Sequence, residues 1–234
     1  MSEKKMAHAE LVVEPIDANF SLKDKIYESL RNAITSMNIY ADDTELRLDE
    51  RRLSEKLEIS RTPVREALAR LEQEGLVHIV PRRGVYIVRK TKAQILEMIT
   101  AWAALESMAA RLITVNAAND ELASLRKMFS TFEDNQVQAR IDEYSETNID
   151  FHQAILKMSR CQLLTELADN LFIHMRSIRA RTISEEDRAH RSIIDHMHII
   201  EALESRDTEL SERLVREHTL NLAAHVEKYV DYLE

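Results

Sequence analysis

Three arginines stand close together in the segment SRTPVREALARLEQEGL at residues 60–76, although the chain as a whole carries a net charge of −9. The guanidinium group of arginine offers paired donors that match O6 and N7 of guanine in the DNA major groove. This segment predicts a helix, and residues three or four apart are neighbours on a helix surface, so Arg61 and Arg65 share one exposed face. An alternative is that they only solubilise the helix. The chemistry indicated by Arg61 and Arg65 is contact with a nucleic acid.

A second set of residues suits metal binding. Asn148 and His152 stand four apart in NIDFHQAIL, and His196 and His218 follow in two later segments. Imidazole and amide groups on three helices could converge on one cation inside a bundle. A histidine beside apolar residues is also often a hydrogen-bonded core residue. Spacing alone leaves both interpretations open.

The arginines must be positioned by a small mixed domain. A helix that begins at Ser60 or Thr62 has Pro63 in its first turn and ends at Gly75, which agrees with the preferences of helix termini. Two β-branched runs joined by Pro81–Gly84 indicate a hairpin. The other predicted elements are a helix at 21–37, a strand at 45–48, a helix capped by Asp49, and strands at 76–80 and 85–88. This order is that of a winged helix-turn-helix.

The histidines must be positioned by a helical domain. Both glycines, Gly75 and Gly84, precede the last 150 residues, which also lack proline. Sheets need turns, and turns use glycine and proline. Helices are expected at 92–116, 119–134, 137–160, 162–182, 185–205 and 208–232, with caps at Thr91, Asn119, Ser184 and Asp207.

The expected fold class is therefore mostly α, with an N-terminal winged helix-turn-helix followed by an all-helical bundle of about six helices. The domains are a flexible arm at 1–20, the DNA-binding domain at 21–90 and the helical domain at 91–234. Residues 21–90 hold 14 Lys and Arg against 12 Asp and Glu, while 91–234 hold 16 against 25. The acidic domain is expected to face away from DNA.

Composition excludes several classes of protein. The chain has no apolar run of 18 residues and no apolar core near its N-terminus, so neither a membrane span nor a secretion signal is expected. Its single cysteine, Cys161, excludes an intrachain disulfide and fits the cytoplasm. We interpret Cys161 as structural.

Residues 48–88 resemble the DNA-binding domain of GntR-type bacterial transcription regulators, most specifically in SRTPVREAL and LEQEGLV. The resemblance implies binding to double-stranded DNA. It assigns base readout to Arg61 and Arg65, a contact with the backbone or a base edge to Arg51, and phosphate or minor-groove contacts to the others. The implied DNA-binding residues are Arg51, Ser60, Arg61, Thr62, Arg65, Arg82, Arg83 and Gly84.

Residues 91–234 resemble the FadR-type helical ligand-binding domain of GntR regulators, the FCD domain. Many members carry Asp or Asn, then x3-His, then two histidines separated by 21 residues, as do Asn148, His152, His196 and His218 here. The resemblance implies that these four bind a divalent metal, which would be zinc, with nickel or manganese as alternatives. Four neutral ligands leave the metal charge uncompensated, and an octahedral ion keeps open positions. We therefore expect an anionic effector, a carboxylate or phosphate, at or beside the metal.

The effector site departs from the pattern of the family. Many relatives have R-x-x-L-E in the first helix of this domain, and here Trp102 replaces the arginine in WAALE. Trp102 could stack on a planar effector or fill the core. Arg176 and Arg179 are candidate anion partners, unless they only form a solvated face. His174 is a candidate for the same cavity.

Together these features predict a cytoplasmic transcription repressor that binds a palindromic operator as a homodimer and is released by its effector. One rival is a metal-responsive regulator without an organic effector. Another is a metal-dependent enzyme that activates water. Against the enzyme, the sequence places no acid/base carboxylate at an evident spacing beside the histidines.

Overall fold

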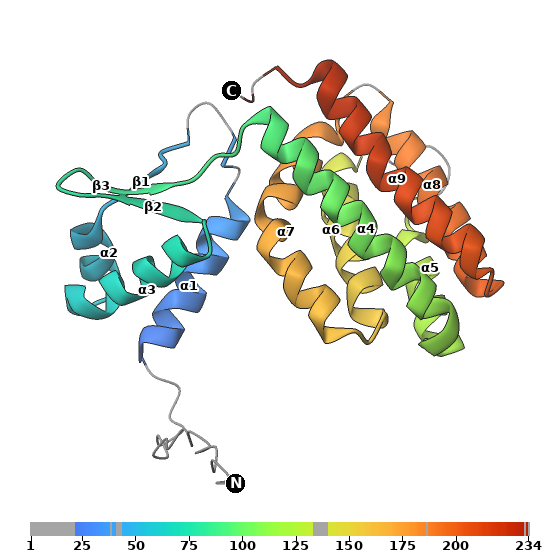
Figure 1. The fold of residues 1–234 in the computed structure, drawn as a ribbon, viewed down its shortest axis with the longest axis horizontal. Helices are drawn as coiled ribbons and strands as arrows, with labels where there is room; N and C mark the ends of the chain where they lie inside the picture. Colours follow the sequence, from blue (N-terminus) through green and yellow to red (C-terminus); the bar gives the residue numbers. More distant parts are fainter. Residues whose placement is uncertain are drawn as a thin grey trace, which may run out of the picture.

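The computed structural model describes residues 22–37, 39–40, 44–132, 140–185, 187–231 and 233. The expected arm at 1–20 lies outside these residues. The described chain forms a mixed N-terminal domain and a helical bundle, which lie side by side in Figure 1. The fold class is mostly α, as the sequence predicts.

The N-terminal domain is a winged helix-turn-helix. Its elements are α1 (Leu22–Ser36), β1 (Arg47–Leu48), α2 (Glu50–Lys56), α3 (Arg61–Gln73), β2 (Val77–Val80) and β3 (Gly84–Ile87). The strands form an antiparallel sheet in the order β1-β3-β2. Arg47 pairs with Tyr86, and Val77 pairs with Ile87. The hairpin of β2 and β3 is the wing, and it projects away from the helical bundle (Figure 1).

Helix α3 follows the boundaries that the sequence predicts. Ser60 is its extended N-cap. Gly75 lies just beyond its C-terminus at φ +73°, a left-handed conformation that glycine adopts without a steric penalty. The buried face of α3 includes Val64 and Leu68, both fully buried in the core that also contains Ile26, Leu30 and Ile34 of α1. This packing fixes the opposite face of α3 toward solvent.

The helical domain contains the six predicted helices. They are α4 (Lys92–Asn116), α5 (Asn119–Phe129), α6 (Ile141–Met158), α7 (Gln162–Thr182), α8 (Arg188–Glu204) and α9 (Thr208–Tyr229). Two predicted caps are wrong. The N-cap of α5 is Ala118, whose N–H donates to Glu121 at 2.7 Å. The N-cap of α8 is Asp187 rather than Ser184.

Helices α4 and α9 run side by side (Figure 1). Lys92, at the start of α4, donates to the main-chain carbonyls of Glu227 and Val230 at the end of α9, at 2.8 and 2.9 Å, so the two helices are antiparallel. Of the described helices, α4 is long and apolar enough to cross a membrane, with a mean hydropathy of 1.2, but half of that window is buried inside the protein. Such burial is typical of a core helix.

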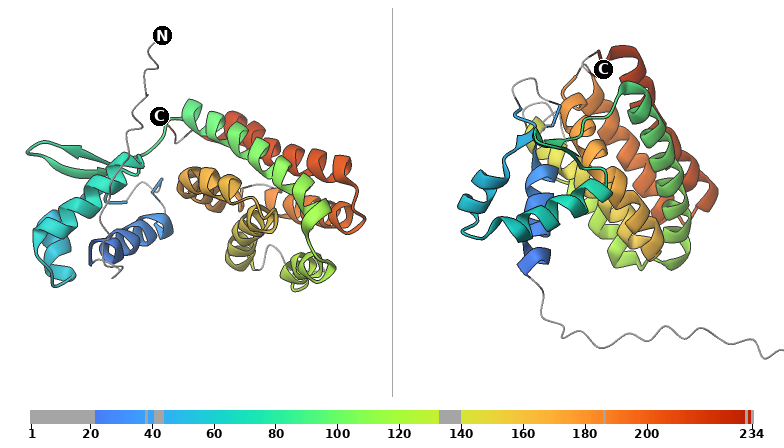
Figure 2. Two further views of the ribbon diagram at one scale, coloured as in Figure 1. Left: turned by 60° about the horizontal axis from the view of Figure 1, so that its bottom comes forward. Right: turned by 60° about the vertical axis from the view of Figure 1, so that its left-hand side comes forward.

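Helix α7 of the bundle contacts α1 of the N-terminal domain (Figures 1 and 2). Arg176 donates to the main-chain carbonyl of Thr35 at 3.0 Å, and Arg181 donates to that of Tyr40. The Tyr40 hydroxyl lies 2.9 Å from Nδ1 of His174. The two domains therefore meet through polar contacts that α7 supplies.

Candidate metal centre and nucleic-acid interface

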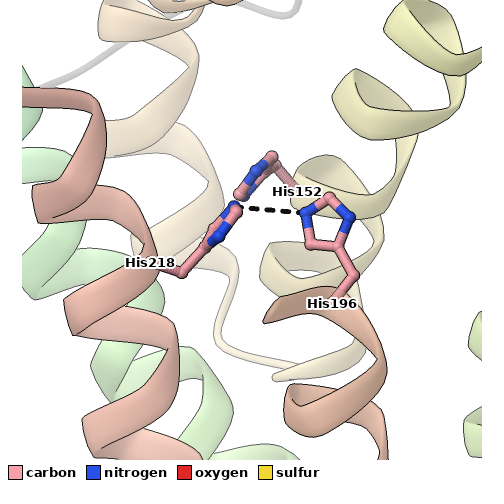
Figure 3. A group of neighbouring side chains, drawn as sticks. All are labelled: His152, His196 and His218. Atoms are coloured by element: carbon pink, nitrogen blue, oxygen red, sulfur yellow. Dashed lines mark hydrogen bonds between the residues drawn. The ribbon is translucent and has the colours of Figure 1, made fainter. Parts of the chain in front are cut away.

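Three histidines from three helices meet inside the bundle. His152 lies on α6, His196 on α8 and His218 on α9 (Figure 3). One ring nitrogen from each lies within 4.8 Å of the others. The closest approach is 3.2 Å, between Nε2 of His196 and Nε2 of His218. The structure therefore brings these three predicted ligands together.

An oxygen atom lies near Nδ1 of each of these imidazoles. The pairs are His152 with the Glu106 carboxylate at 2.6 Å, His218 with Asp195 at 3.0 Å, and His196 with the Tyr144 hydroxyl at 3.3 Å. An ionised carboxylate accepts, so Nδ1 of a histidine beside it carries the proton, and Nε2 is left with a lone pair. Nε2 of His152 is buried and has no hydrogen-bond partner among the described residues. Histidines that bind metals are typically held in this way by a carboxylate, carbonyl or water.

All three imidazoles are neutral in the folded protein. Burial is the main cause that lowers the pKa of His152 and of His196 well below 6.5. Burial also lowers the pKa of His218, although Asp195 opposes the shift. A metal binds only the deprotonated nitrogen of an imidazole. These three side chains therefore offer metal-competent nitrogens at neutral pH.

Glu106 lies behind His152 in a closed polar network. It is on α4, is 0% exposed, and accepts a hydrogen bond from the Thr219 hydroxyl at 2.7 Å. The guanidinium of Arg179 lies 3.9 Å from the same carboxylate and donates to Thr219 at 3.4 Å. Burial raises the pKa of Glu106, whereas Arg179 lowers it. The net pKa of Glu106 is raised, so Arg179 only partly offsets the effect of burial; the ionised form is the one that accepts from Nδ1 of His152.

The fourth predicted ligand, Asn148, precedes His152 by one turn on α6 and is buried. Ser192 of α8 donates to its amide oxygen at 3.4 Å. Trp102 is buried against Phe172, with ring centroids 6.2 Å apart. Its indole N–H partly opposes the rise in the pKa of Glu106 that burial causes. The geometry is too poor for a hydrogen bond, and the N–H has no other partner among the described residues. Trp102 is thus part of the packed core around the network.

The other candidate effector residues are already engaged in contacts. Arg179 is buried beside Glu106. Arg176 forms an ion pair with Glu146 at 3.0 Å and, like His174, contacts the N-terminal domain. Arg176 and His174 therefore lie at the domain contact. Cys161, a free cysteine, is the N-cap of α7.

The sequence shows no carboxylate at an evident spacing from the histidines, but the structure places two carboxyl groups beside them. Glu106 and Asp195 lie 46 and 23 residues from the histidines they contact, so sequence spacing did not reveal them. One signal was available for Glu106: it is the only charged residue between Glu97 and Arg111, in an otherwise uncharged stretch. A lone charge in such a stretch must find a partner inside the fold.

The predicted DNA-binding residues lie on the surface of the N-terminal domain. Ser60, Arg61, Thr62 and Arg65 are exposed on α3, and Arg82 and Arg83 are exposed at the tip of the wing. Arg82 adopts φ +64° and Gly84 adopts φ +123° in the tight turn. In Figure 1, α2, α3 and the wing lie on the side away from the helical bundle. This side is therefore open to a duplex.

Two of these arginines have acidic partners. Arg65 Nε donates to Glu50 of α2 at 2.6 Å, and Arg51 Nε donates to Glu55 at 2.8 Å. Exposed pairs of this kind contribute little to stability. Arg65 and Arg51 are therefore held near the surface by bonds that a phosphate or a base could replace at low cost.

Comparison with known proteins identifies the family. The model of the bacterial regulatory proteins of the gntR family matches residues 22–87, and the FCD domain model matches residues 97–221. The chain belongs to the GntR family. Its FCD domain is consistent with the FadR subfamily, and it contains Glu106 and all three clustered histidines.

The relatives of this GntR regulator span most of its length. The HTH-type transcriptional repressor RspR of Escherichia coli is 26% identical over 88% of this chain and 89% of its own. The Uxu operon regulator of Haemophilus influenzae is 28% identical over 74% of this chain and 70% of its own. The structure of E. coli McbR/YncC has a TM-score of 0.72 at 24% identity, and covers 90% of this chain and 99% of that chain. The family, RspR and the Uxu operon regulator are transcription regulators, so this chain is a DNA-binding regulator and not an enzyme.

Proposed function

We propose that this regulator is a cytoplasmic repressor that binds a palindromic operator as a homodimer. An anionic metabolite would release it by binding at or beside a divalent metal in the FCD domain. The ligands would be Asn148, His152, His196 and His218, and the metal would be zinc, with nickel or manganese as alternatives. The observation that carries the proposal is the meeting of three neutral imidazoles whose Nδ1 atoms are already engaged.

The donor set fits a divalent metal. Without a cation, the buried Nε2 of His152 has no partner among the described residues, which costs free energy. Nε2 of His196 and Nε2 of His218 form a hydrogen bond of 3.2 Å with each other, which a metal bound between them would replace. A bound metal would supply the positive charge that attracts an anionic effector. Glu106 and Asp195 would hold the imidazoles in the binding orientation.

A homodimer is supported by exposed apolar side chains on α4. Met108 is 46% exposed and Val115 is 75% exposed. They lie about one turn on either side of Arg111, which forms an ion pair with Glu212 of α9 at 3.1 Å. Such side chains favour a second protein surface. A two-fold dimer would present two copies of α3 to two half-sites of an operator.

Helix α7 supplies a route between the effector and the DNA. It contacts the metal network through Arg179 and the N-terminal domain through His174, Arg176 and Arg181. A shift of α7 when the effector binds would move the N-terminal domain relative to the bundle. Displaced domains would no longer fit the spacing of the two half-sites.

The test combines metal analysis with DNA binding. Purified protein is measured for bound zinc, nickel and manganese before and after treatment with a chelator. Gel-shift titrations on the operator are then run with a panel of carboxylic and phosphorylated acids. We expect one divalent ion per chain, and release of DNA by an acid that acts only on the metal-loaded protein.

The matched pair of variants is His196→Ala and His190→Ala, which lie on the same helix, with His190 exposed. His196→Ala should lose the metal and the acid response, whereas His190→Ala should keep both. DNA affinity that follows the metal alone, without any response to acids, would favour the metal-responsive regulator. A protein that retains no divalent ion and yet responds to an acid would refute the metal site.

A further inference from the structure

A pocket of about 410 Å³ lies between α8 and α9, beside the histidine cluster. Its size is within the range of about 300–1,000 Å³ that is typical of small-molecule sites. His218 and Asp195 line it, and Asp195 is the residue that accepts from Nδ1 of His218. The pocket therefore borders His218 on its Nδ1 side, whereas Nε2 faces the other histidines.

The pocket is rich in positive charge. Arg188, Arg191 and Lys228 line it. Neither Arg188 nor Arg191 forms an ion pair with any residue that the structure describes. Burial is the main cause that lowers the pKa of Arg188 to about 10, and the nearby cations Arg179 and Arg191 add to the shift. The cations Arg179 and Arg191 act on Arg188 more strongly than the nearby anion Glu185 does, so an added anion would be favoured at Arg188.

Two acidic side chains at the pocket, Asp195 and Glu185, already contact histidines. Asp195 accepts from His218 at 3.0 Å. Glu185 lies 2.6 Å from Nε2 of His225, a second histidine in the lining. His225 is 5% exposed, and its Nδ1 is buried without a hydrogen-bond partner among the described residues. Nε of Arg188 is also buried without a hydrogen-bond partner among the described residues. The negatively charged oxygens of a ligand would supply the acceptor that this N–H lacks, whereas Nδ1 of His225 would accept a hydrogen bond rather than donate one.

The start of α8 adds to this preference. The helix begins at Arg188, and the side chain of its N-cap, Asp187, makes no capping hydrogen bond. The first N–H groups of a helix attract anions. Two arginines with no ion pair, one lysine and a helix terminus thus favour the same kind of ligand.

We propose that the pocket between α8 and α9 binds the carboxylate or phosphate group of a small metabolite through Arg188, Arg191 and Lys228. This site is separate from the side chains predicted for the effector. The proposal rests on the proposed function in one respect: the anion bound in this pocket would be the effector, or part of it. The ligand would also lie against Ser192 and Asp195, which hold Asn148 and His218 from outside. Binding here would therefore change the orientation of two predicted metal ligands.

The test measures anion binding to the full-length protein by isothermal titration calorimetry, with inorganic phosphate and succinate as probes. Both are titrated into chelator-treated protein and into protein reloaded with zinc. The variants are Arg188→Gln and Arg191→Gln. The control is Arg213→Gln, an exposed arginine of α9 outside the pocket. Arg188 is partly buried and could affect folding, so circular dichroism melting accompanies each variant, and the exposed Arg191 provides the independent test.

We expect at least one probe to bind without zinc, and each pocket variant to weaken it by about tenfold or more, as for the loss of a charge-assisted hydrogen bond. The Arg213→Gln protein should bind like the wild type. A preference for phosphate or for succinate identifies which anion the pocket selects, and either preference supports the site.

Three results would refute the proposal that this pocket binds an anion. They are no binding of either probe, unchanged binding in folded Arg191→Gln, or binding that needs zinc and is lost in His196→Ala. The last result would leave the metal proposal intact, because the anion would then lie on the metal. Zinc-independent binding that Arg191→Gln weakens would support the pocket even in a protein that retains no metal.

Discussion

Replacing Glu106 by glutamine removes the negative charge behind His152 while it keeps the size of the side chain. The carboxylate accepts from His152 at 2.6 Å and from Thr219 at 2.7 Å, and lies 3.9 Å from Arg179. The glutamine oxygen can still accept from His152, but a neutral bond is about half as strong as one to a carboxylate. Changes of this kind reduce metal affinity by about 10- to 100-fold, which corresponds to about 1.4–2.7 kcal/mol.

The same substitution leaves Arg179 buried without its counter-ion. Loss of one partner of a buried ion pair costs about 3–5 kcal/mol of unfolding free energy. The separation of 3.9 Å is long for an ion pair, so we expect a value near 3 kcal/mol, the lower end of that range. Glu106→Gln should therefore bind zinc more weakly in competition with a chromophoric chelator, and should unfold at a lower urea concentration with or without metal.

The control is Glu97→Gln, the same change at an exposed position of α4. It should alter neither the zinc affinity nor the urea midpoint. Zinc affinity within about twofold of the wild type would refute the role of Glu106 as the group that holds His152. If the stability were unchanged as well, the carboxyl would be neutral in the folded protein, as burial alone favours.

Three further outcomes are expected. Arg65→Ala should weaken operator binding by about 1–3 kcal/mol and relax the base preference; equal losses on operator and random-sequence DNA in gel shifts would instead identify a phosphate contact. Burial, with a smaller contribution from Lys90, lowers the pKa of His174 from 6.5 to about 4, so the unfolded chain takes up this proton first as the pH falls. The free energy of unfolding should therefore decrease from pH 6.5 toward pH 4, by up to about 3 kcal/mol, and urea titrations of His174→Gln should lack this part of the dependence; identical slopes in the two proteins would contradict it. Removal of the metal should lower Tm, because a ligand at a hundred times its Kd adds about 2.7 kcal/mol; an equal response to chelator in His196→Ala would place the metal elsewhere.

Most of the fold follows from local sequence signals. Thr91 caps α4 in a capping box with Gln94, and Asp207 caps α9 through the N–H of Leu210, so both starts were predictable. The start of α8 was not, because Ser184 and Asp187 are both favourable N-cap types. Glu185, which precedes the helix, makes a tertiary contact with His225. Propensity alone cannot weigh such a contact.

The candidate metal site was only partly predictable. Family resemblance implies that Asn148, His152, His196 and His218 are metal ligands, whereas spacing alone leaves open whether they are ligands or hydrogen-bonded core residues. Their partners Glu106 and Asp195 depend on how α4 and α8 pack against α6 and α9. Such packing joins residues far apart in the chain, and no local pattern encodes it.

The contact between the two domains is made largely to the main chain. Arg176 and Arg181 of α7 donate to the carbonyl oxygens of Thr35 and Tyr40, and every amino acid presents a carbonyl. Substitutions at position 35 would therefore leave that acceptor in place. An N-terminal domain from another regulator would dock on this α7 if its backbone followed the same path. The junction thus suits the exchange of DNA-binding domains by recombination, with new operators acquired while the control by α7 is kept.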